Sequence, residues 1–274
     1  MRNQSKLFTG FVLTALMVVA LVATIVAEEP QKITDSTSVE ELKTLASNGN
    51  ADAMLQLGEK LIPEQGTDSG ATEALHWLQK AADAGKTQAW YDLGFIYANT
   101  HGVKEDLLRA INYWKTGAEK GNADCQFSVG LVYQAGERIP GGVKADPVEA
   151  VKWYRLAAEQ HNTEAIQHLA MMNSMGMGIE QDNSEAIKWF RKGAELGDAD
   201  CLWGLGHCYL DGRGAPQDSV LAYALYSASL DGFRNLEQKQ AYSERCVELG
   251  KKLTKEQLKR AEPLIAEWKA KGNR

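Results

Sequence analysis

A set of residues recurs along this chain at a nearly constant interval. The segment GNADCQFSVGLVY at residues 121–133 returns as GDADCLWGLGHCY at residues 197–209. One column of turn residues has successive spacings of 36, 36, 40 and 36 residues: Gly49, Gly85, Gly121, His161 and Gly197. Five copies at one period are typical of a repeat protein, in which each copy buries its apolar face by stacking on its neighbours.

Two further columns support the same five copies. The alanines in the first of them have the same spacings as the turn residues, so both columns place one insertion within residues 137–144. In the second column a glycine follows an apolar residue in four copies, as in Leu93-Gly94. A glycine inside a helix costs about 1 kcal/mol, so we expect a neighbouring helix to approach closely there. The alanine column is Ala74, Ala110, Ala150, Ala186 and Ala222.

Each copy has the pattern of two helices joined by a turn. In residues 185–197 the apolar side chains recur at the spacing of one helical face. Before the second helix of the third copy, Asp146, Pro147 and Glu149 have the order of an N-cap, a first-turn proline and a capping-box acid. Glycine-bearing turns such as SMGMGIEQD separate the two helices. We call the first helix of each copy helix A and the second helix B.

The repeated columns resemble those of Sel1-like repeats, which are relatives of tetratricopeptide repeats. The resemblance covers residues 42–233 and rests on the motifs G-N-A-D-C, L-G-x-x-Y and E-A-x-x-W-[YF]-R. It implies an all-α fold, a right-handed α-solenoid of helix-turn-helix repeats with a concave face built mainly from helices A. Members of the family commonly act as adaptors for protein assembly, and exported bacterial members often have envelope or host-facing roles.

The two ends of the repeat array and its irregular copies lead to further expectations. Residues 234–274 resemble a closing pair of capping helices, and Thr254 and Gln257 fit a capping box before the second of them. Pro263 is expected to kink or break that last helix. His161 in place of a turn glycine, Asn173 in place of a tyrosine and the insertion at 137–144 predict less regular packing of copies three and four.

The first residues differ in composition from the rest of the chain. Arg2 and Lys6 precede an uncharged run at residues 7–27, which predicts a signal peptide or an N-terminal membrane anchor over residues 1–27. Residues 28–41 follow as a linker. Either interpretation exports the chain, to the periplasm, outside the cell, or to an anchored position at the membrane. Loss of residues 1–27 would change the net charge from −6 to −8, and no basic run is present, so we expect no nucleic-acid partner.

Motifs for catalysis or metal binding are missing from the sequence. We find no HExxH, Cys-x-x-Cys, GxSxG, SxxK or phosphate-binding glycine motif, so we expect no metal, no cofactor and no enzymatic activity. Helix geometry separates most pairs of the four cysteines by more than a disulfide spans. A bond between Cys208 and Cys246 remains open, beside the alternative of small buried thiols.

Aromatic and polar residues on the predicted helices A indicate where a partner would bind. The column Met54, Trp90, Gln126, Ile166 and Leu202 changes residue type freely, as an exposed groove-lining position would. Exposed aromatic side chains beside polar groups are favoured anchors for partners, although core packing is an alternative for each of them. The candidate partner-binding residues are Trp90, Asp92, Gln126, Ser128, His168 and Trp203.

These features predict an exported scaffold that holds a protein or peptide partner in its concave groove. Two alternatives remain open at this point. Tryptophan and tyrosine faces could stack on sugars in a peptidoglycan- or carbohydrate-binding module. A hydrolase of cell-wall-type substrates would need a nucleophile and a base that converge from different copies.

Overall fold

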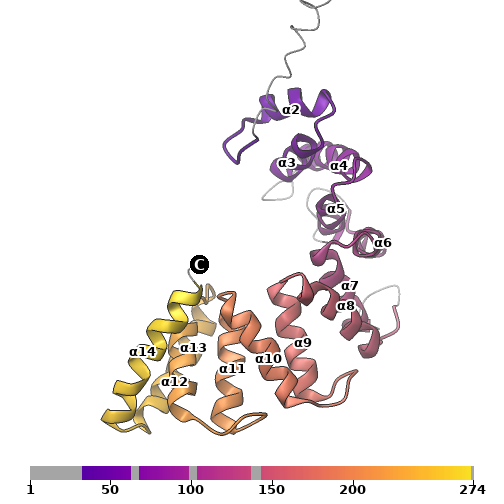
Figure 1. The fold of residues 1–274 in the computed structure, drawn as a ribbon. Coiled ribbons are helices and arrows are strands. Elements are labelled where there is room, and N and C mark those ends of the chain that lie inside the picture. Colours follow the sequence, from indigo (N-terminus) through magenta and orange to yellow (C-terminus); the bar gives the residue numbers. More distant parts are fainter. Residues whose placement is uncertain (1–32, 63–67, 99–103, 137–142, 273–274) are drawn as a thin grey trace, which may run out of the picture.

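The structure is a computed structural model that describes residues 33–62, 68–98, 104–136 and 143–272. The described residues form helices and no strand, and Figure 1 shows the helices following one another along an arc. The helices are α2 (Val39–Ser47), α3 (Ala51–Leu61), α4 (Asp68–Asp83), α5 (Gln88–Ala98), α6 (Leu107–Glu119), α7 (Ala123–Ala135), α8 (Pro147–Glu159), α9 (Thr163–Met175), α10 (Asn183–Glu195), α11 (Ala199–Asp211), α12 (Ser219–Ser229), α13 (Leu236–Lys251) and α14 (Lys255–Gly272).

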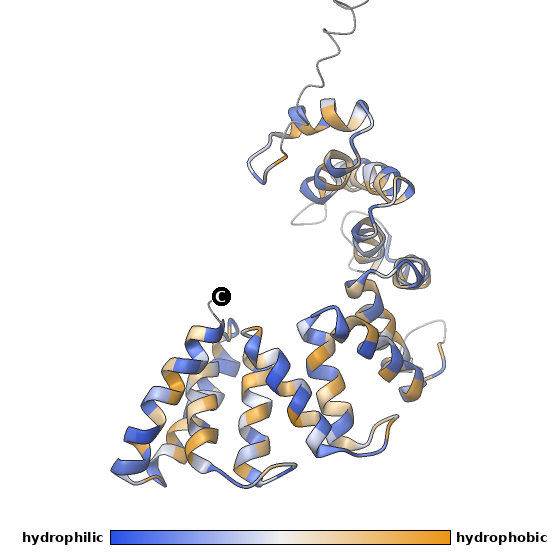
Figure 2. Ribbon diagram, in the orientation of Figure 1, coloured by the Kyte–Doolittle hydropathy of each residue, from blue (hydrophilic) through white to orange (hydrophobic). Residues whose placement is uncertain are grey.

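Helices A and B alternate along the array and pack on their neighbours in sequence. Helices A are α3, α5, α7, α9 and α11, and helices B are α4, α6, α8, α10 and α12. From α2 to α13 each helix packs against the next one in the chain, α14 packs on α12, and α5 also contacts α7 just as α9 contacts α11. In Figure 2 the helices carry both apolar and polar segments, as expected where one side of each helix is buried. The predicted all-α solenoid is confirmed.

The predicted aspartate caps hold the starts of helices B. The side chain of Asp146 accepts a hydrogen bond from the backbone N–H of Glu149 at 3.0 Å, and Pro147 is the first residue of α8. The carboxylate of Glu149 pairs with Lys152 instead of turning back to the cap, so the capping box is only half formed. Asp106, Asp182 and Asp218 cap α6, α10 and α12 in the same manner.

The glycines within helices A allow the close helix approach that we predicted. An ideal Cβ at Gly94 would lie 2.3 Å from the indole nitrogen of Trp114 on α6. At Gly130 a Cβ would lie 2.5 Å from the ring of Tyr154 on α8. Because each glycine lacks a side chain, a large side chain from helix B packs directly on the backbone of helix A.

Copies three and four are packed as continuously as the others, against our expectation. His161 adopts φ 67°, in the same left-handed region as the turn glycines, so the turn is preserved. Asn173 is buried, and its side-chain amide donates to the carbonyl of Leu169 at 2.8 Å. A core cluster runs without interruption from Ala150 to Ala228. The replacements are accommodated because the backbone geometry of the turn does not change.

Two helices close the C-terminal end of the array. The backbone N–H of Thr254 donates to the Gln257 side chain at 2.8 Å, and that of Gln257 donates to the Thr254 hydroxyl at 3.2 Å, which confirms the capping box. Pro263 does not break α14, which runs on to Gly272. Ala261, with Leu264 and Ile265 beside it, packs on α12 and holds the helix on both sides of the proline.

The predicted N-terminal segment lies almost wholly outside the described residues. The signal peptide or anchor over residues 1–27 is not described, and neither is most of the linker over 28–41. Helix α2 begins at Val39, within the stretch assigned to the linker, because Ser38 caps it. Within the described residues, no helix is both long and apolar enough to cross a lipid bilayer.

Candidate functional site

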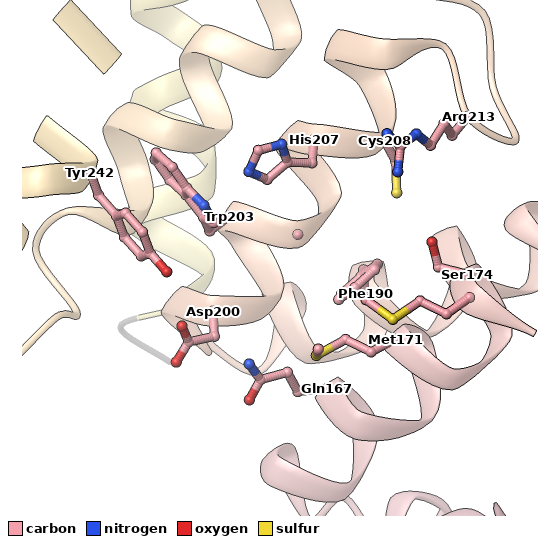
Figure 3. Close-up of a pocket in the computed structure, with 12 residues that line it drawn as sticks. Gln167, Met171, Ser174, Phe190, Asp200, Trp203, His207, Cys208, Arg213 and Tyr242 are labelled. Carbon is pink, nitrogen blue, oxygen red and sulfur yellow. The ribbon is translucent and has the colours of Figure 1, made fainter. Parts of the chain in front are cut away.

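A groove of about 280 Å³ lies between helices α9, α11 and α13, with one side chain from α10 at its base (Figure 3). It is open to solvent on one side, and its walls are mainly apolar. Its lining residues from α9 and α11 recur at the spacing of a single helical face. The lining residues are Gln167, Met171, Ser174, Met175, Phe190, Asp200, Trp203, Gly204, His207, Cys208, Arg213 and Tyr242.

One copy has a glycine at the groove where the other copies have a side chain. Gly204 occupies the column in which earlier copies carry Asp92, Ser128 and His168. An ideal Cβ at Gly204 would lie 2.4 Å from the ring of Phe190, which packs directly under the glycine. The glycine therefore lets the phenylalanine ring pack against the backbone of α11 at the groove, and any larger residue would displace that ring.

Stacked aromatic rings form the wall on the α13 side. The Trp203 ring is stacked between Tyr226 at 4.0 Å and Tyr242 at 4.1 Å between centroids. His207 meets the tryptophan edge-on at 5.6 Å. Both faces of the indole are covered, so Trp203 supplies a rigid wall and no free ring face.

Two methionines on α9 form the opposite, more exposed side. Met171 is 39% exposed and Met175 is 60% exposed, although both are apolar side chains. Methionine has a flexible, polarizable side chain that adapts to partners of different shape. The exposed apolar area of the groove thus comes from its most adaptable residues.

Polar groups mark the two ends of the groove. Figure 3 places Asp200 and Gln167 at one end and Cys208 and Arg213 at the other. Burial, and then the neighbouring Asp198, raise the pKa of Asp200 above its ordinary value. The Arg213 guanidinium is already paired with Asp211 at 2.9 Å. The end at Asp200 therefore carries the charge that is available to a ligand.

The titratable groups in the groove are tuned toward their neutral forms. Burial, followed by the charge of Arg245, lowers the pKa of His207, so its ring is neutral at pH 7. Burial raises the pKa of the Cys208 thiol to about 11, which keeps it protonated. Among the described residues, no group of three or more His, Cys, Asp or Glu side chains is placed to hold a metal ion. The groove offers shape and hydrogen bonds rather than an activated nucleophile.

The structure separates the predicted partner-binding residues. Only Trp203 lines the groove, where its ring faces are covered by the two tyrosines. His168 lies one copy earlier, where its Nδ1 is 3.1 Å from the side-chain oxygen of Gln134 and its ring is 5.0 Å from that of Tyr154. Burial lowers the pKa of His168, with the charge of Glu164 opposing it.

Three of the predicted residues lie in the core or use their polar groups within the chain. The prediction that the column of Trp90 and Gln126 lines a groove is wrong. Gln126 is buried and accepts a hydrogen bond from Gln160 at 2.8 Å. Ser128 is buried and donates to the carbonyl of Asp124 at 2.8 Å. Trp90 is half-buried and packs against two core clusters.

Asp92 has a different environment. Its side chain is buried, with only 8% of the residue exposed, and its Oδ2 atom has no hydrogen-bond partner. Burial, and then the charge of Glu59, raise its pKa to about 7, although a hydrogen bond from Gln88 opposes the change. A buried carboxylate without a counter-charge is costly, which distinguishes Asp92 from the other predicted residues.

Sequence reasoning missed most of the groove. Met171 and Tyr242 were not predicted, because a methionine in a helix and a tyrosine outside the repeats carry no distinctive pattern. Gly204 had a usable signal: it is the one glycine in a column that otherwise carries polar side chains. A glycine there predicts either close packing or an opening, and only the position of Phe190 decides between them.

The four cysteines are free and buried. The hypothesis of a bond between Cys208 and Cys246 is wrong in this structure. The Cys246 thiol lies 3.3 Å from the hydroxyl of Ser227, while Cys208 belongs to a different core cluster. The small thiols fill space between helices.

Comparison with known proteins agrees with this architecture. The chain is similar to the solved structure of a protective antigen present in uropathogenic Escherichia coli strains that displays an SLR fold, with 28% identity and a TM-score of 0.73. That match covers 85% of this chain but 48% of the antigen, so the chain spans about half the antigen's length. A Sel1 repeat protein from Oxalobacter formigenes is 26% identical with a TM-score of 0.62, over 72% of this chain and 80% of that one. No curated protein matches the chain.

The family assignment follows from the repeats themselves. The Sel1 repeat matches five consecutive segments of the chain, at residues 51–86, 88–122, 123–162, 163–198 and 199–231. These segments divide the described helices into the A and B pairs seen in the fold. The chain belongs to the Sel1 repeat family, whose members generally mediate protein–protein interaction.

Proposed function

We propose that this protein is a scaffold that binds a segment of a partner protein in the groove between α9, α11 and α13. The observation that carries the proposal is an open, apolar groove on the helices A whose exposed side is formed by Met171 and Met175. Exposed apolar side chains around a hollow are typical of protein interaction sites. A partner side chain in the groove would contact the methionines and the aromatic wall at once.

The size and lining of the groove favour side chains of a peptide over other ligands. About 280 Å³ lies at the lower end of small-molecule pockets, which suits a few side chains better than a cofactor. Sugar binding, an alternative from the sequence, would need an open aromatic face. Trp203 does not offer one, because Tyr226 and Tyr242 cover both sides of its ring.

Site-specific crosslinking in native cells tests this proposal. A photoreactive amino acid is placed at Met171, and in a matched protein at Met177. The two methionines are equally exposed, at 39% and 38%, but only Met171 lines the groove. We expect a defined partner protein to be captured at position 171 and not at 177, and mass spectrometry of the adduct identifies the captured segment. Equal capture at both positions, or capture at neither, would contradict the proposal.

We also propose that residues 1–27 direct the chain out of the cytoplasm and that it works in the cell envelope or outside the cell. The support is the charged start followed by the uncharged run at residues 7–27. Fractionation of cells that produce the full chain, compared with a chain that lacks residues 1–27, tests this. After the outer barrier of the cell has been opened, added protease is expected to cut the repeats of the full chain. We expect the repeats of the chain that lacks residues 1–27 to stay protected. Protection of both chains in the cytoplasm would contradict export.

A further inference from the structure

Charge is divided unequally between the two sets of helices. Helices α5, α7, α9 and α11 contain no lysine or arginine. Helices α6, α8 and α10, by contrast, carry seven of these basic residues. A ligand that meets these four helices along their length therefore meets acidic groups and no cation from the helices themselves, although Asp211 is paired with Arg213 of the turn after α11. The acids of the four helices A are Asp92, Asp124, Glu164, Asp200 and Asp211.

Hydrogen bonds place several of these acids next to the start of the following helix A. The side-chain amide of Asn162, the cap of α9, donates to Asp124 on α7 at 2.9 Å. In the same way Gln238 on α13 donates to Asp200 on α11 at 3.4 Å. These contacts join one copy to the next, so the acids form a row along the array. We call Asp92, Asp124, Glu164 and Asp200 the acidic row.

The row is interrupted where an asparagine cap is replaced. Asp198 caps α11 and accepts from the backbone N–H of Cys201 at 2.7 Å, but it cannot donate to Glu164 as an asparagine would. Burial raises the pKa of Asp198, and the charge of Glu164 raises it further. Asp198 thus adds a second carboxylate whose charge interacts with that of Glu164 in this part of the row.

Asp92 adds a buried acid without a counter-charge beneath this surface. It is more than nine-tenths buried, and its Oδ2 atom lacks a partner in the chain. Its charged neighbours are Glu59 on α3 and Asp124 on α7, which are acidic as well. A buried carboxylate normally pairs with a cation or a set of donors. Here the chain itself supplies only the amide of Gln88.

We propose that the partner segment bound on the helices A is basic, with lysine or arginine side chains along the acidic row. This inference rests on the proposed function and adds the chemistry of the partner. The groove takes an apolar side chain of the same segment, since Asp200 both ends the row and lines the groove.

The spacing of the row fits an extended chain better than a single ion. Packed helices lie about 10 Å apart, and an extended peptide advances about 3.3 Å per residue. One acid per copy therefore corresponds to one basic residue in about three. A single metal ion would need several carboxylates at one point, and the described residues contain no such group.

Peptide binding to the full-length protein tests the inference. The probe is a labelled synthetic peptide with lysine at every third position, glycine elsewhere and one leucine. Its matched controls are a peptide with glutamate in place of lysine and a peptide with the same lysines gathered at one end. Fluorescence anisotropy gives the dissociation constant. We expect the spaced lysine peptide to bind tightest, and its binding to weaken as salt is raised.

A pair of charge-neutralising variants locates the contact. Asp124→Asn with Glu164→Gln removes two charges from the acidic row, and an asparagine at 124 still accepts from Asn162. Glu119→Gln with Glu159→Gln removes two charges from exposed ends of helices B, so the net charge of the two proteins is equal. We expect the first pair to weaken binding of the lysine peptide about tenfold and the second less than twofold. Circular dichroism shows that both proteins are folded.

The outcomes separate this inference from the proposed function. Equal weakening by both pairs, or equal binding of the lysine and glutamate peptides, would overturn the basic partner. If crosslinking at Met171 then still captures a partner with a neutral or acidic segment, the scaffold function stands without the inference. Both the scaffold function and the basic partner are supported if a basic segment is captured at Met171. That capture should be lost in Asp124→Asn with Glu164→Gln and kept in Glu119→Gln with Glu159→Gln.

Discussion

Replacing Asp92 with asparagine tests whether a buried, unpaired carboxylate costs this protein stability. The pKa of Asp92 is raised from 3.8 to about 7, mainly by burial. At about 1.4 kcal/mol per pKa unit, this difference corresponds to about 4 kcal/mol. The asparagine keeps the acceptor for Gln88 and removes the charge. We therefore expect Asp92→Asn to raise the free energy of unfolding by about 4 kcal/mol at pH 8.

The pH dependence has a defined sign. Below pH 3.8 the carboxyl is neutral in both the folded and the unfolded chain, so the two proteins differ little. Between pH 3.8 and 7 it ionises only on unfolding, and the wild-type protein loses about 1.4 kcal/mol per pH unit relative to the variant. Above pH 7 the carboxylate is charged in both states, and the difference stays constant.

Urea unfolding followed by circular dichroism, at a series of pH values, measures the difference between the two proteins. Glu119→Gln serves as the control, since Glu119 is an exposed acid on α6 in the same copy. We expect its effect to be within about 0.5 kcal/mol at every pH. A gain for Asp92→Asn that is as large at pH 4 as at pH 8 would refute the ionisation argument. A loss at pH 8 would show that the carboxylate has a partner within the chain.

Three other substitutions have expected outcomes in the same unfolding assay. Asp198→Asn keeps the cap of α11 and can donate a hydrogen bond to Glu164, so we expect about 1 kcal/mol of added stability at pH 7. This gain is expected to shrink as the pH falls, because Asp198 of the wild-type protein becomes protonated. An unchanged gain at pH 3 would contradict this reasoning. His161→Gly relieves a positive φ of 67°, and we expect a gain of about 0.5–1 kcal/mol. Glu159→Gly, at the last residue of α8, relieves no such φ and is expected to lose about 0.5 kcal/mol. Trp203→Ala empties the space between two stacked tyrosines, and we expect a loss of about 3–5 kcal/mol; a loss below 1 kcal/mol would show that the ring is not part of the core.

The opposing effects expected at Asp92 link stability to binding. If a basic side chain of a partner lies near Asp92, the carboxylate that weakens the free protein strengthens the complex. Asp92→Asn is then expected to be more stable and to bind the spaced lysine peptide less tightly. Such a trade-off is common where a binding site needs a group that the isolated fold does not favour.

The helices and turns were predictable because their signals are local. Asp146 and Pro147 define the start of α8 through bonds within four residues, and the turn glycines end helices through their own backbone conformation. The glycine of Leu93-Gly94 indicated close helix contact even before Trp114 was known to fill the space. Repetition at one period then extended these local signals to the whole array.

The candidate site was predictable only in part. The column of Trp90 and Gln126 appeared exposed because its residues vary, yet Gln126 is buried, so variation among the copies does not require exposure. Asp92 was selected as a possible polar contact, and its missing partner became visible only in the structure. A sequence lists polar residues without showing which of them already have partners.

The repeat, the helix boundaries and the absence of basic residues from four of the helices A follow from the amino-acid sequence, since each depends on spacing or composition along the chain. Three contacts could be known only from the folded chain: Gly204 lies over Phe190, Tyr242 covers one side of Trp203, and Asp124 accepts from the cap of the next copy. Those contacts join residues from different helices, and their geometry depends on how each helix is rotated and packed against its neighbours.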